Sequence, residues 1–256
     1  MDNTKTILLS HIFNEEYLLP FWLHHHKNMF DEIIIIDYNS TDKSMEICKN
    51  ICPECKIIKT RNKFFEAEEI DKEIMDIENS IQGIKIALNT TEFLFIEKPI
   101  KDIFQYNKNI SYLVNCISPY SMNTYNINNY YELLKNLLND NIRFHHDRCT
   151  RQLHNYPNGK YIPGRHDTLN VSEPTNEAHV IWFGYYPMNE NLLKRKLQIQ
   201  QNMTQSDRDR GLGFQHFCNE DLILSRNKER YESGKELKSM NLSLYNLLNN
   251  IIQSLE

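Results

Sequence analysis

The stretch that decides the fold reads TILLSHIFNEE at residues 6–16 and, after a helical segment, DEIIIIDYNSTD at residues 31–42. The four isoleucines bounded by acidic residues predict a strand buried on both faces, because such strands carry nearly continuous apolar runs. Both apolar runs end in carboxylates and amides. Open α/β sheets bind ligands at the carboxyl ends of their strands, so this block predicts both an architecture and the place of a site.

Outward from this block, strand and helix patterns alternate. Strands are expected at 7–12, 33–36 and 56–59. A helix over 15–28 would be capped by Asn14, and a second helix, capped by Ser40 or Thr41, would end at Pro53. This β-α-β-α-β order predicts a parallel sheet with right-handed crossovers.

The remaining chain has weaker patterns and no clear linker or internal repeat. Expected elements are a charged helix at 66–80, strands at 84–88, 93–96 and 111–117, a helix at 130–138, short extended pieces over 143–171, a basic helix at 191–201, a loop at 204–217 and a final helix at 237–255. The prediction is one domain over 1–256 with an embellished C-terminal third.

Composition narrows the function classes. With 40% hydrophobic residues in 256, the chain can bury a sizeable core, and its net charge of −5 argues against a nucleic-acid partner. The apolar start is too short for a signal peptide, and no apolar run approaches the ~20 residues of a membrane span. We therefore expect a cytoplasmic protein whose six cysteines are reduced.

Two clusters resemble metal sites at first sight. The cysteines at 48, 52 and 55 supply only half of a zinc site, so reduced thiols at a helix-ending turn are the simpler interpretation. The histidines at 24, 25 and 26 point about 100° apart on a helix, which disfavours shared ligation. One buried and two exposed imidazoles are expected.

Several charged side chains are candidates for a site. Asp37 ends a strand, where its carboxylate can accept hydrogen bonds from a base or a ribose, whereas Asp42 fits a capping role. Arg195 and Lys196 can neutralise a diphosphate, although a solvated helix face explains them equally well. A second group lies between 148 and 179, where histidines suit acid–base work near neutral pH: Arg148, Arg151, His154, Arg165, His166 and His179.

Taken together, the motifs SHIFNEEYLLPFW (10–22), IIIIDYNSTD (33–42) and TEFL (91–94) resemble those of family-2-like nucleotide-sugar glycosyltransferases of the GT-A fold. The resemblance covers the first hundred residues. A later pattern, YPM (186–188), RKLQI (195–199) and GLGFQH (211–216), is similar to the C-terminal signature of one branch of these enzymes.

The resemblance implies a GT-A-type, Rossmann-like α/β fold with a mostly parallel sheet flanked by helices. Residues 1–118 would be the nucleotide-sugar-binding half, and 119–256 the acceptor-side half with the C-terminal helices. It implies a hexosyltransferase with a UDP-sugar donor and a glycan, lipid or protein acceptor. Asp37 would contact the nucleoside, and Asn14 and Glu15 would line the same pocket.

The same resemblance implies an Asp-x-Asp motif that holds Mg²⁺ or Mn²⁺ on the donor diphosphate. Here the matching positions read Asn89, Thr90 and Thr91, followed by Glu92, so both metal aspartates are absent. Three interpretations stay open. The transferase is metal-independent, or Glu92 holds a weak metal with a distant partner such as His216, or the chain binds a donor without turnover.

The implied reaction is a direct displacement, which inverts the anomeric centre. Arg195, Lys196 and His216 would close over the diphosphate, while the acceptor hydroxyl approaches from the side of Arg148, Arg151 and Arg165. Glu220, Asp221 and His166 are alternative general bases. Two other classes stay open, a non-catalytic nucleotide-sugar-binding module and a nucleotidyltransferase.

Overall fold

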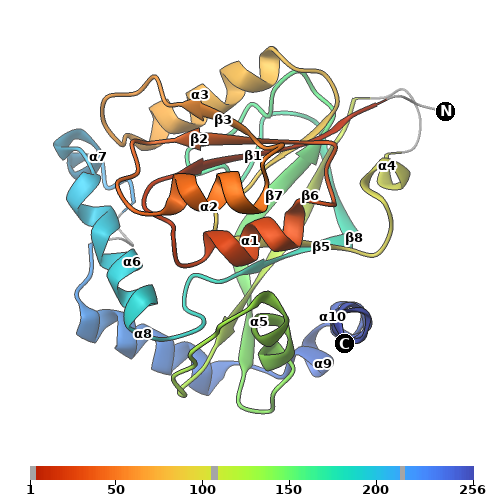
Figure 1. Ribbon diagram of the computed structural model, residues 1–256, viewed down its shortest axis with the longest axis vertical. Coiled ribbons are helices and arrows are strands. Elements are labelled where there is room, and N and C mark those ends of the chain that lie inside the picture. Colours follow the sequence, from red (N-terminus) through yellow and green to blue (C-terminus); the bar gives the residue numbers. More distant parts are fainter. Residues whose placement is uncertain (1–3, 105–108, 214–216) are drawn as a thin grey trace.

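The computed structural model describes residues 4–104, 109–213 and 217–256, which form a mixed α/β fold around one sheet (Figure 1). Within this part of the chain the sheet has eight strands in the order β3-β2-β1-β4-β7-β6-β8-β5. Their bounds are β1 Thr6–Ile12, β2 Glu32–Asp37, β3 Lys56–Lys59, β4 Ile84–Ala87, β5 Glu92–Ile96, β6 Ser111–Tyr120, β7 Arg143–His154 and β8 Ser172–Trp182. The α/β class and the mostly parallel sheet flanked by helices are confirmed.

The parallel half of the sheet follows from the apolar runs. β2 pairs in parallel with β1 and with β3, and β1 also pairs in parallel with β4. Because side chains alternate along a strand, Leu8 and Ile35 face one helical layer that includes Trp22 of α1 (Leu19–His26). Ile7 and Ile34 face the opposite layer, α3 (Ala67–Asn79). The sheet is therefore covered on both faces, as the isoleucine run predicts.

The second half of the sheet departs from the sequence-based expectation. β7 is one strand of 12 residues where short extended pieces are expected, and β8 has no counterpart among the predicted strands. Polar residues interrupt both strands, and several of them, including Arg151 and His154, are buried against partners distant in sequence. Apolar periodicity cannot signal such strands.

The helices also correct several predicted boundaries. Beyond α1 and α3 they are α2 Ser44–Ile51, α4 Ile100–Ile103, α5 Tyr130–Leu137, α6 Glu190–Asn202, α7 Gln205–Asp209, α8 Glu220–Ser233, α9 Leu237–Met240 and α10 Leu242–Leu255. The long helix α8 and the short helix α7 are not predicted. The expected final helix is broken at Asn241, whose side chain caps α10 by accepting from Leu244 N at 2.9 Å.

The predicted caps of the first two helices are wrong. α1 begins at Leu19, and Asn14 instead adopts φ 51° and accepts from Thr41 N at 2.8 Å. Neither Ser40 nor Thr41 caps α2, because Asp42 Oδ1 accepts from Ser44 N at 2.9 Å. Asn14 and Ser40 tie the two turns to each other, whereas Asp42 contacts the first residue of its own helix.

The cysteine and histidine expectations are corrected as well. Cys52 and Cys55 form a disulfide with Cα atoms 5.3 Å apart, because the Cys-Pro-Glu-Cys turn brings the two ends of the motif together. His25 and His26 are both buried and only His24 is exposed. In the described ranges no cluster of three or more His, Cys, Asp or Glu side chains could hold a metal, and no helix there could span a membrane.

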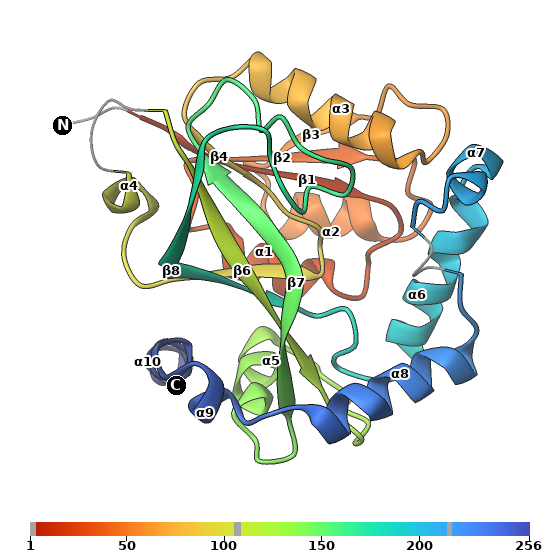
Figure 2. The ribbon, with the colours of Figure 1, turned by 180° about the vertical axis from the view of Figure 1, so that it is seen from behind.

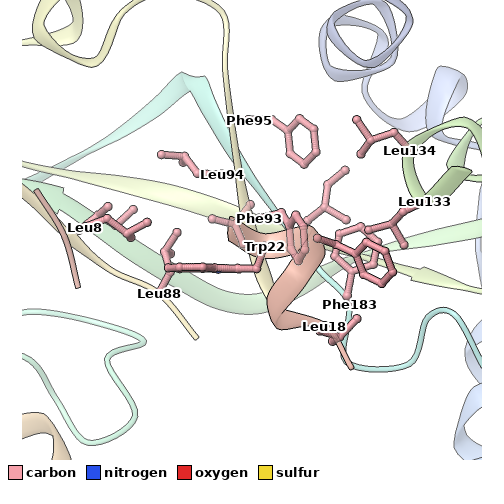
Figure 3. Packing of buried hydrophobic residues seen from close by; sticks show 14 of the residues in the cluster. Leu8, Leu18, Trp22, Leu88, Phe93, Leu94, Phe95, Leu133, Leu134 and Phe183 are labelled. Atoms are coloured by element: carbon pink, nitrogen blue, oxygen red, sulfur yellow. The ribbon is translucent and has the colours of Figure 1, made fainter. Parts of the chain in front are cut away.

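The main core links the two halves of the chain through Trp22. Figure 3 shows this side chain packed among residues that include Leu88, Phe93 and Phe183, and Trp22 is fully buried. Its indole Nε1 donates to Glu92 O at 2.9 Å. The core thereby holds the first residue of β5 in place against α1.

Candidate functional site

The turns that follow β1 and β2 are joined at the carboxyl edge of the sheet. Asn14 N donates to Ser40 Oγ at 3.1 Å, and Glu15 N donates to Ser44 Oγ at 2.9 Å. Asp37 Oδ1 accepts from Ser40 N at 2.9 Å. Asp37 thus shapes the turn with one carboxylate oxygen, while Oδ2 has no hydrogen-bond partner within the described ranges.

A pocket of about 280 Å³ opens at this edge of the sheet. Aromatic rings from three turns line it together with amide side chains, one lysine and the end of α6: Phe13, Tyr38, Asn39, Asn62, Lys63, Phe64, Phe65, Gln201, Asn202, Met203 and Thr204. Figure 2 shows α6 and α7 beside β1 and β2, and Phe65 forms an isolated bridge with Met203. An aromatic pocket with amide donors and acceptors suits a planar heterocycle.

His11 lies behind this pocket. Its ring centroid is 5.8 Å from that of Tyr38 and 6.0 Å from that of Phe65. Its Nδ1 lies 3.4 Å from Arg165 Nη2. Burial and the positive charges of Arg165 and Arg151 hold the pKa of His11 well below its usual value, so the imidazole is neutral near pH 7. His11 therefore connects the aromatic pocket to a cluster of arginines.

Glu92 is the centre of that cluster. Arg151 Nε donates to Glu92 Oε2 at 2.8 Å, and Arg151 Nη2 donates to Oε1. Asn89 donates to the same carboxylate through its backbone N at 2.9 Å and its Nδ2 at 3.0 Å. Burial acts to raise the pKa of Glu92, but the charge and hydrogen bonds of Arg151, the hydrogen bond from Asn89 N and the charge of Arg165 together outweigh it, so the pKa is lowered. Glu92 is thus an ionised carboxylate with both oxygens occupied.

Arg165 forms a second buried ion pair beside the first. Its Nη1 donates to Asp71 Oδ1 at 2.5 Å and its Nη2 donates to Asn89 Oδ1 at 2.8 Å. The next residue, His166, places its Nδ1 2.7 Å from Arg151 Nη1. Because arginine only donates, Nδ1 accepts and the proton of a neutral His166 lies on Nε2. This tautomer makes His166 Nε2 a hydrogen-bond donor.

Two basic neighbours on α6 have different environments. Arg195 Nε and Nη2 donate to the Glu15 carboxylate at 2.5 and 2.6 Å, which fixes α6 on the turn after β1. Lys196 Nζ instead lies 3.8 Å from the centroid of the Tyr185 ring and 5.6 Å from that of Trp182. Burial and the charge of Arg195 lower the pKa of Lys196 to about 7.

The structure brings many of the predicted site residues together. Asn89, Glu92, Arg151, Arg165 and His166 form one hydrogen-bonded cluster. Asn14, Glu15 and Arg195 form a second group, joined by the Gln198 side chain, which donates to Asn14 O at 3.0 Å. Residues predicted as nucleotide-binding and as acceptor-side therefore share one cluster.

Other predicted residues lie elsewhere. Glu220 and Asp221 are exposed in the first turn of α8, and Glu220 lines a separate hollow of about 630 Å³ between α6 and α8. The Thr91 carbonyl accepts from Phe183 N at 2.7 Å. His154 and His179 are buried. His216 lies outside the described residues, as does the side chain of Arg148.

Several residues of the site are missed by reasoning from the sequence alone. His11, Phe13 and Phe65 line or back the pocket, Glu73 of α3 holds the lining residue Tyr38, and Asp71 of α3 holds Arg165. A signal exists for His11, which follows Ile7 and Leu9 at every second position and so shares their buried face. For Asp71 and Glu73 none exists, because a charged helix normally exposes its carboxylates.

The donor set at Glu92 does not fit a divalent cation. Mg²⁺ and Mn²⁺ prefer carboxylate and other hard oxygen ligands, and here the positions of the expected aspartates are Asn89 and Thr91. Both oxygens of Glu92 already accept from Arg151 and Asn89. A divalent cation at this position would need free carboxylate oxygens, and the arginine guanidinium already binds them.

Comparisons with known proteins found only distant likenesses. No protein-family model and no curated protein sequence matches this chain. Among solved structures it is similar to S. aureus TarS 1-349, with 14% identity and a TM-score of 0.36 over 48% of this chain and 38% of that chain. It is also similar to glucosyl-3-phosphoglycerate synthase from Mycobacterium tuberculosis, with 13% identity and a TM-score of 0.29 over 36% of this chain and 35% of that chain. In both cases the match spans less than two fifths of the other protein.

Proposed function

We propose that this protein is a glycosyltransferase that moves a sugar from a nucleotide-diphosphate donor, UDP-linked, to an acceptor hydroxyl. One observation carries the proposal: a pocket of aromatic and amide side chains and a buried arginine cluster are joined through His11 at the carboxyl edge of the parallel strands. Such an edge is the usual ligand position of open α/β sheets. The pocket suits the nucleobase of the donor, and the arginine cluster suits the negative charge of the diphosphate that follows the nucleoside.

The donor nucleoside occupies the pocket in this proposal. Phe13 and Phe65 line the pocket and can pack against the base, and the amides of Asn39 and Asn62 can pair with its polar edge. Asp37 lies at the start of the same turn as Tyr38 and Asn39, and its Oδ2 can accept from a ribose hydroxyl or a base N–H. Asn14 and Glu15 shape this region by fixing the neighbouring turn.

The diphosphate meets cationic side chains in place of a metal ion. Arg165 lies next to His11, and Arg151 belongs to the same cluster, while Lys196 supplies an amine without a carboxylate partner in the described part of the chain. Preorganised cations stabilise the charge that develops on a departing diphosphate. Arg165 already pairs with Asp71, and Arg151 already pairs with Glu92. Lys196 therefore carries the positive charge that the diphosphate would balance.

The acceptor approaches from the segment that carries Arg165 and His166. Its hydroxyl oxygen forms a bond to the anomeric carbon as the bond from that carbon to the diphosphate oxygen breaks, and a base takes the hydroxyl proton. Direct displacement inverts the anomeric centre. The Nε2–H tautomer of His166 suits donation to a substrate oxygen better than proton uptake, so Glu220 and Asp221 remain the alternative bases.

Calorimetry tests the donor site. We expect UDP and UDP-GlcNAc to bind the wild-type chain, and Asp37→Ala to weaken UDP binding about 10- to 150-fold, because a charged hydrogen bond contributes about 1.5–3 kcal/mol. Asp102→Ala, which removes an exposed carboxylate of α4, is the matched control and should bind as wild type. Absence of nucleotide binding, or equal binding by the Asp37 variant, would contradict the site.

A chelator separates the metal interpretations. We expect release of UDP from UDP-GlcNAc, with water or a glycan acceptor, to continue unchanged in EDTA and to show no gain with added Mn²⁺. Loss of turnover in EDTA that Mn²⁺ restores would overturn the metal-independent mechanism.

A non-catalytic nucleotide-sugar-binding module is the second candidate. One observation favours it: Glu92 and Glu15 each form an ion pair with an arginine, so neither carboxylate is available as a base. Donor binding without hydrolysis or transfer to any acceptor would support it. A nucleotidyltransferase would instead release pyrophosphate from a nucleoside triphosphate, but Asn14, Glu15 and Glu16 stand where such an enzyme needs a glycine-rich basic loop.

A further inference from the structure

Helix α3 carries three buried carboxylates, although its sequence AEEIDKEIMDIEN is that of a charged surface helix. Asp71 and Glu73 are each 4% exposed and Glu78 is fully buried. Burying a carboxylate is costly unless hydrogen bonds or charges compensate for the lost water. The partners of these carboxylates therefore indicate what the helix holds in place.

Asp71 holds the two residues that lead into the arginine cluster. Its Oδ2 accepts from Gly164 N at 2.7 Å, and its Oδ1 accepts from Arg165 Nη1 at 2.5 Å. Both residues have left-handed backbones, with φ 87° at Gly164 and 57° at Arg165. For a residue with a side chain this conformation is unfavourable and persists only where surrounding contacts enforce it.

This unusual backbone determines where two functional groups lie. Arg165 turns its guanidinium onto Asn89, and its carbonyl accepts from Arg151 Nη1 at 3.2 Å. His166 follows directly and reaches the same Arg151 nitrogen. Asp71 contacts none of the residues that line the aromatic pocket, so its influence on the site passes through Arg165.

Glu73 holds the opposite wall of the site. Its Oε2 accepts from Tyr38 Oη at 2.8 Å and from Thr60 Oγ1 at 2.7 Å, and its Oε1 accepts from Arg61 N at 2.7 Å. Asn62 Nδ2 also donates to Glu73 at 3.1 Å. Tyr38 and Asn62 both line the aromatic pocket. One helix thus holds the pocket and the arginine cluster from behind.

We propose that Asp71 and Glu73 are positioning residues with separate tasks. Asp71 orients Arg165 and His166 for the transfer step, and Glu73 shapes the pocket for the donor nucleoside. The proposal rests on the proposed glycosyltransferase function. In this proposal neither carboxylate touches the substrate, and each acts through the residues that it holds in place.

The two tasks predict opposite kinetic signatures. Asp71→Asn keeps a hydrogen-bonding side chain but removes the charge that holds Arg165, and we expect kcat for UDP release from UDP-GlcNAc to fall about 10- to 100-fold, as misplaced catalytic groups do. The Kd for uridine, which lacks the diphosphate that Arg165 is proposed to meet, should stay within about twofold of wild type, since Asp71 contacts none of the residues that line the pocket. Glu73→Gln should raise the Kd for uridine and the KM for UDP-GlcNAc about tenfold with a much smaller change in kcat.

Asp76→Asn is the matched control, because it makes the same change on the same helix. Asp76 also pairs with an arginine, Arg61, at 2.5 Å, but both side chains are nearly half exposed. This variant should match wild type in kcat and in Kd for uridine. If the substitutions only weakened α3 in general, kcat would fall and Kd would rise in all three variants together.

Folding of each variant is checked by circular dichroism and a thermal melt. If Asp71→Asn does not fold, the double variant Asp71→Asn with Arg165→Gln removes the unpaired buried charge. It should fold and show the same loss of kcat with uridine binding retained.

Wild-type kcat in a folded Asp71 variant, or an equal rise of Kd for uridine in the Asp71 and Glu73 variants, would overturn the positioning roles. These results require a wild-type protein that binds UDP and turns over UDP-GlcNAc. Failure of the wild type in those assays would overturn the proposed function itself, so the two failures are distinguishable.

Discussion

Two adjacent cations on α6 illustrate how environment decides the role of a residue. Arg195 donates both of its hydrogen bonds to Glu15, so its charge is balanced within the protein. Lys196 rests on the faces of Tyr185 and Trp182, which attract a cation but do not neutralise it. The sequence presents an Arg-Lys pair, and the structure divides it into a structural ion pair and an unbalanced ammonium.

This difference makes Lys196→Met a test at the residue scale. The folded pKa of about 7 lies below the usual lysine value, so the unfolded chain binds more protons between pH 7 and about 10, and stability rises with pH over that window. Replacement by methionine should remove this slope and raise the melting temperature at pH 7, while UDP binding weakens. Lys194→Met, at an exposed position of the same helix, should change neither property.

The pH dependence of donor binding checks the same residue. A bound diphosphate favours the charged ammonium, so wild-type affinity for UDP should fall as pH rises above about 7. Calorimetry at pH 6, 7 and 8 measures this trend. A pH-independent affinity that Lys196→Met leaves unaltered would mean that Lys196 does not face the donor.

At the scale of elements, helices are held by side chains from other elements. α3 has no capping side chain of its own, and its first residue, Ala67, donates its N–H to Asp207 Oδ2 of α7 at 2.9 Å. Asp207 is buried, and α7 follows directly after α6. The short helix α7 thus fixes the start of the helix that holds the site.

Removal of this cap should therefore loosen α3 from its first turn. We expect Asp207→Ala to lower the free energy of unfolding by about 1 kcal/mol, as loss of a cap typically does, and to speed hydrogen exchange at residues 67–70. Asp209→Ala removes an exposed carboxylate from the same short helix and serves as the control. Equal effects of the two substitutions on urea unfolding would rule out the capping role.

At the scale of the whole molecule, one apolar core runs through both halves of the chain. It joins Leu8 and Ile35 of the parallel strands to Val114 of β6 and to Leu248 of α10. The antiparallel pair of β4 and β7 connects the two groups of strands within one sheet. A continuous core of this kind favours a single cooperative unit.

The two tryptophans allow this cooperativity to be tested. Trp22 lies on α1 and Trp182 ends β8, so each reports on a different half. In Trp182→Phe and in Trp22→Phe, the fluorescence of the remaining tryptophan should give the same urea midpoint as far-ultraviolet circular dichroism of that variant. Separate midpoints within one variant would indicate two independently folding units.

The sequence by itself determined the parallel half of the sheet and the edge at which a site forms. Its apolar runs are continuous, its helices are short and regular, and its polar residues follow the strand ends directly. These signals are local, so they can be interpreted without knowing which residues contact one another in the fold. The strands β1 to β4 and the position of Asp37 at the carboxyl end of β2 follow from them.

Tertiary structure alone decided the chemistry of that edge. Glu92 meets Arg151 across 59 positions, Glu15 meets Arg195 across 180, and Asp71 meets Arg165 across 94. The local sequence around a charged residue does not show whether that residue will be solvated or buried against a distant partner. The strands β7 and β8 and the carboxylates of α3 were hidden for this reason, because the burial of a charge depends on a partner that only the folded chain supplies.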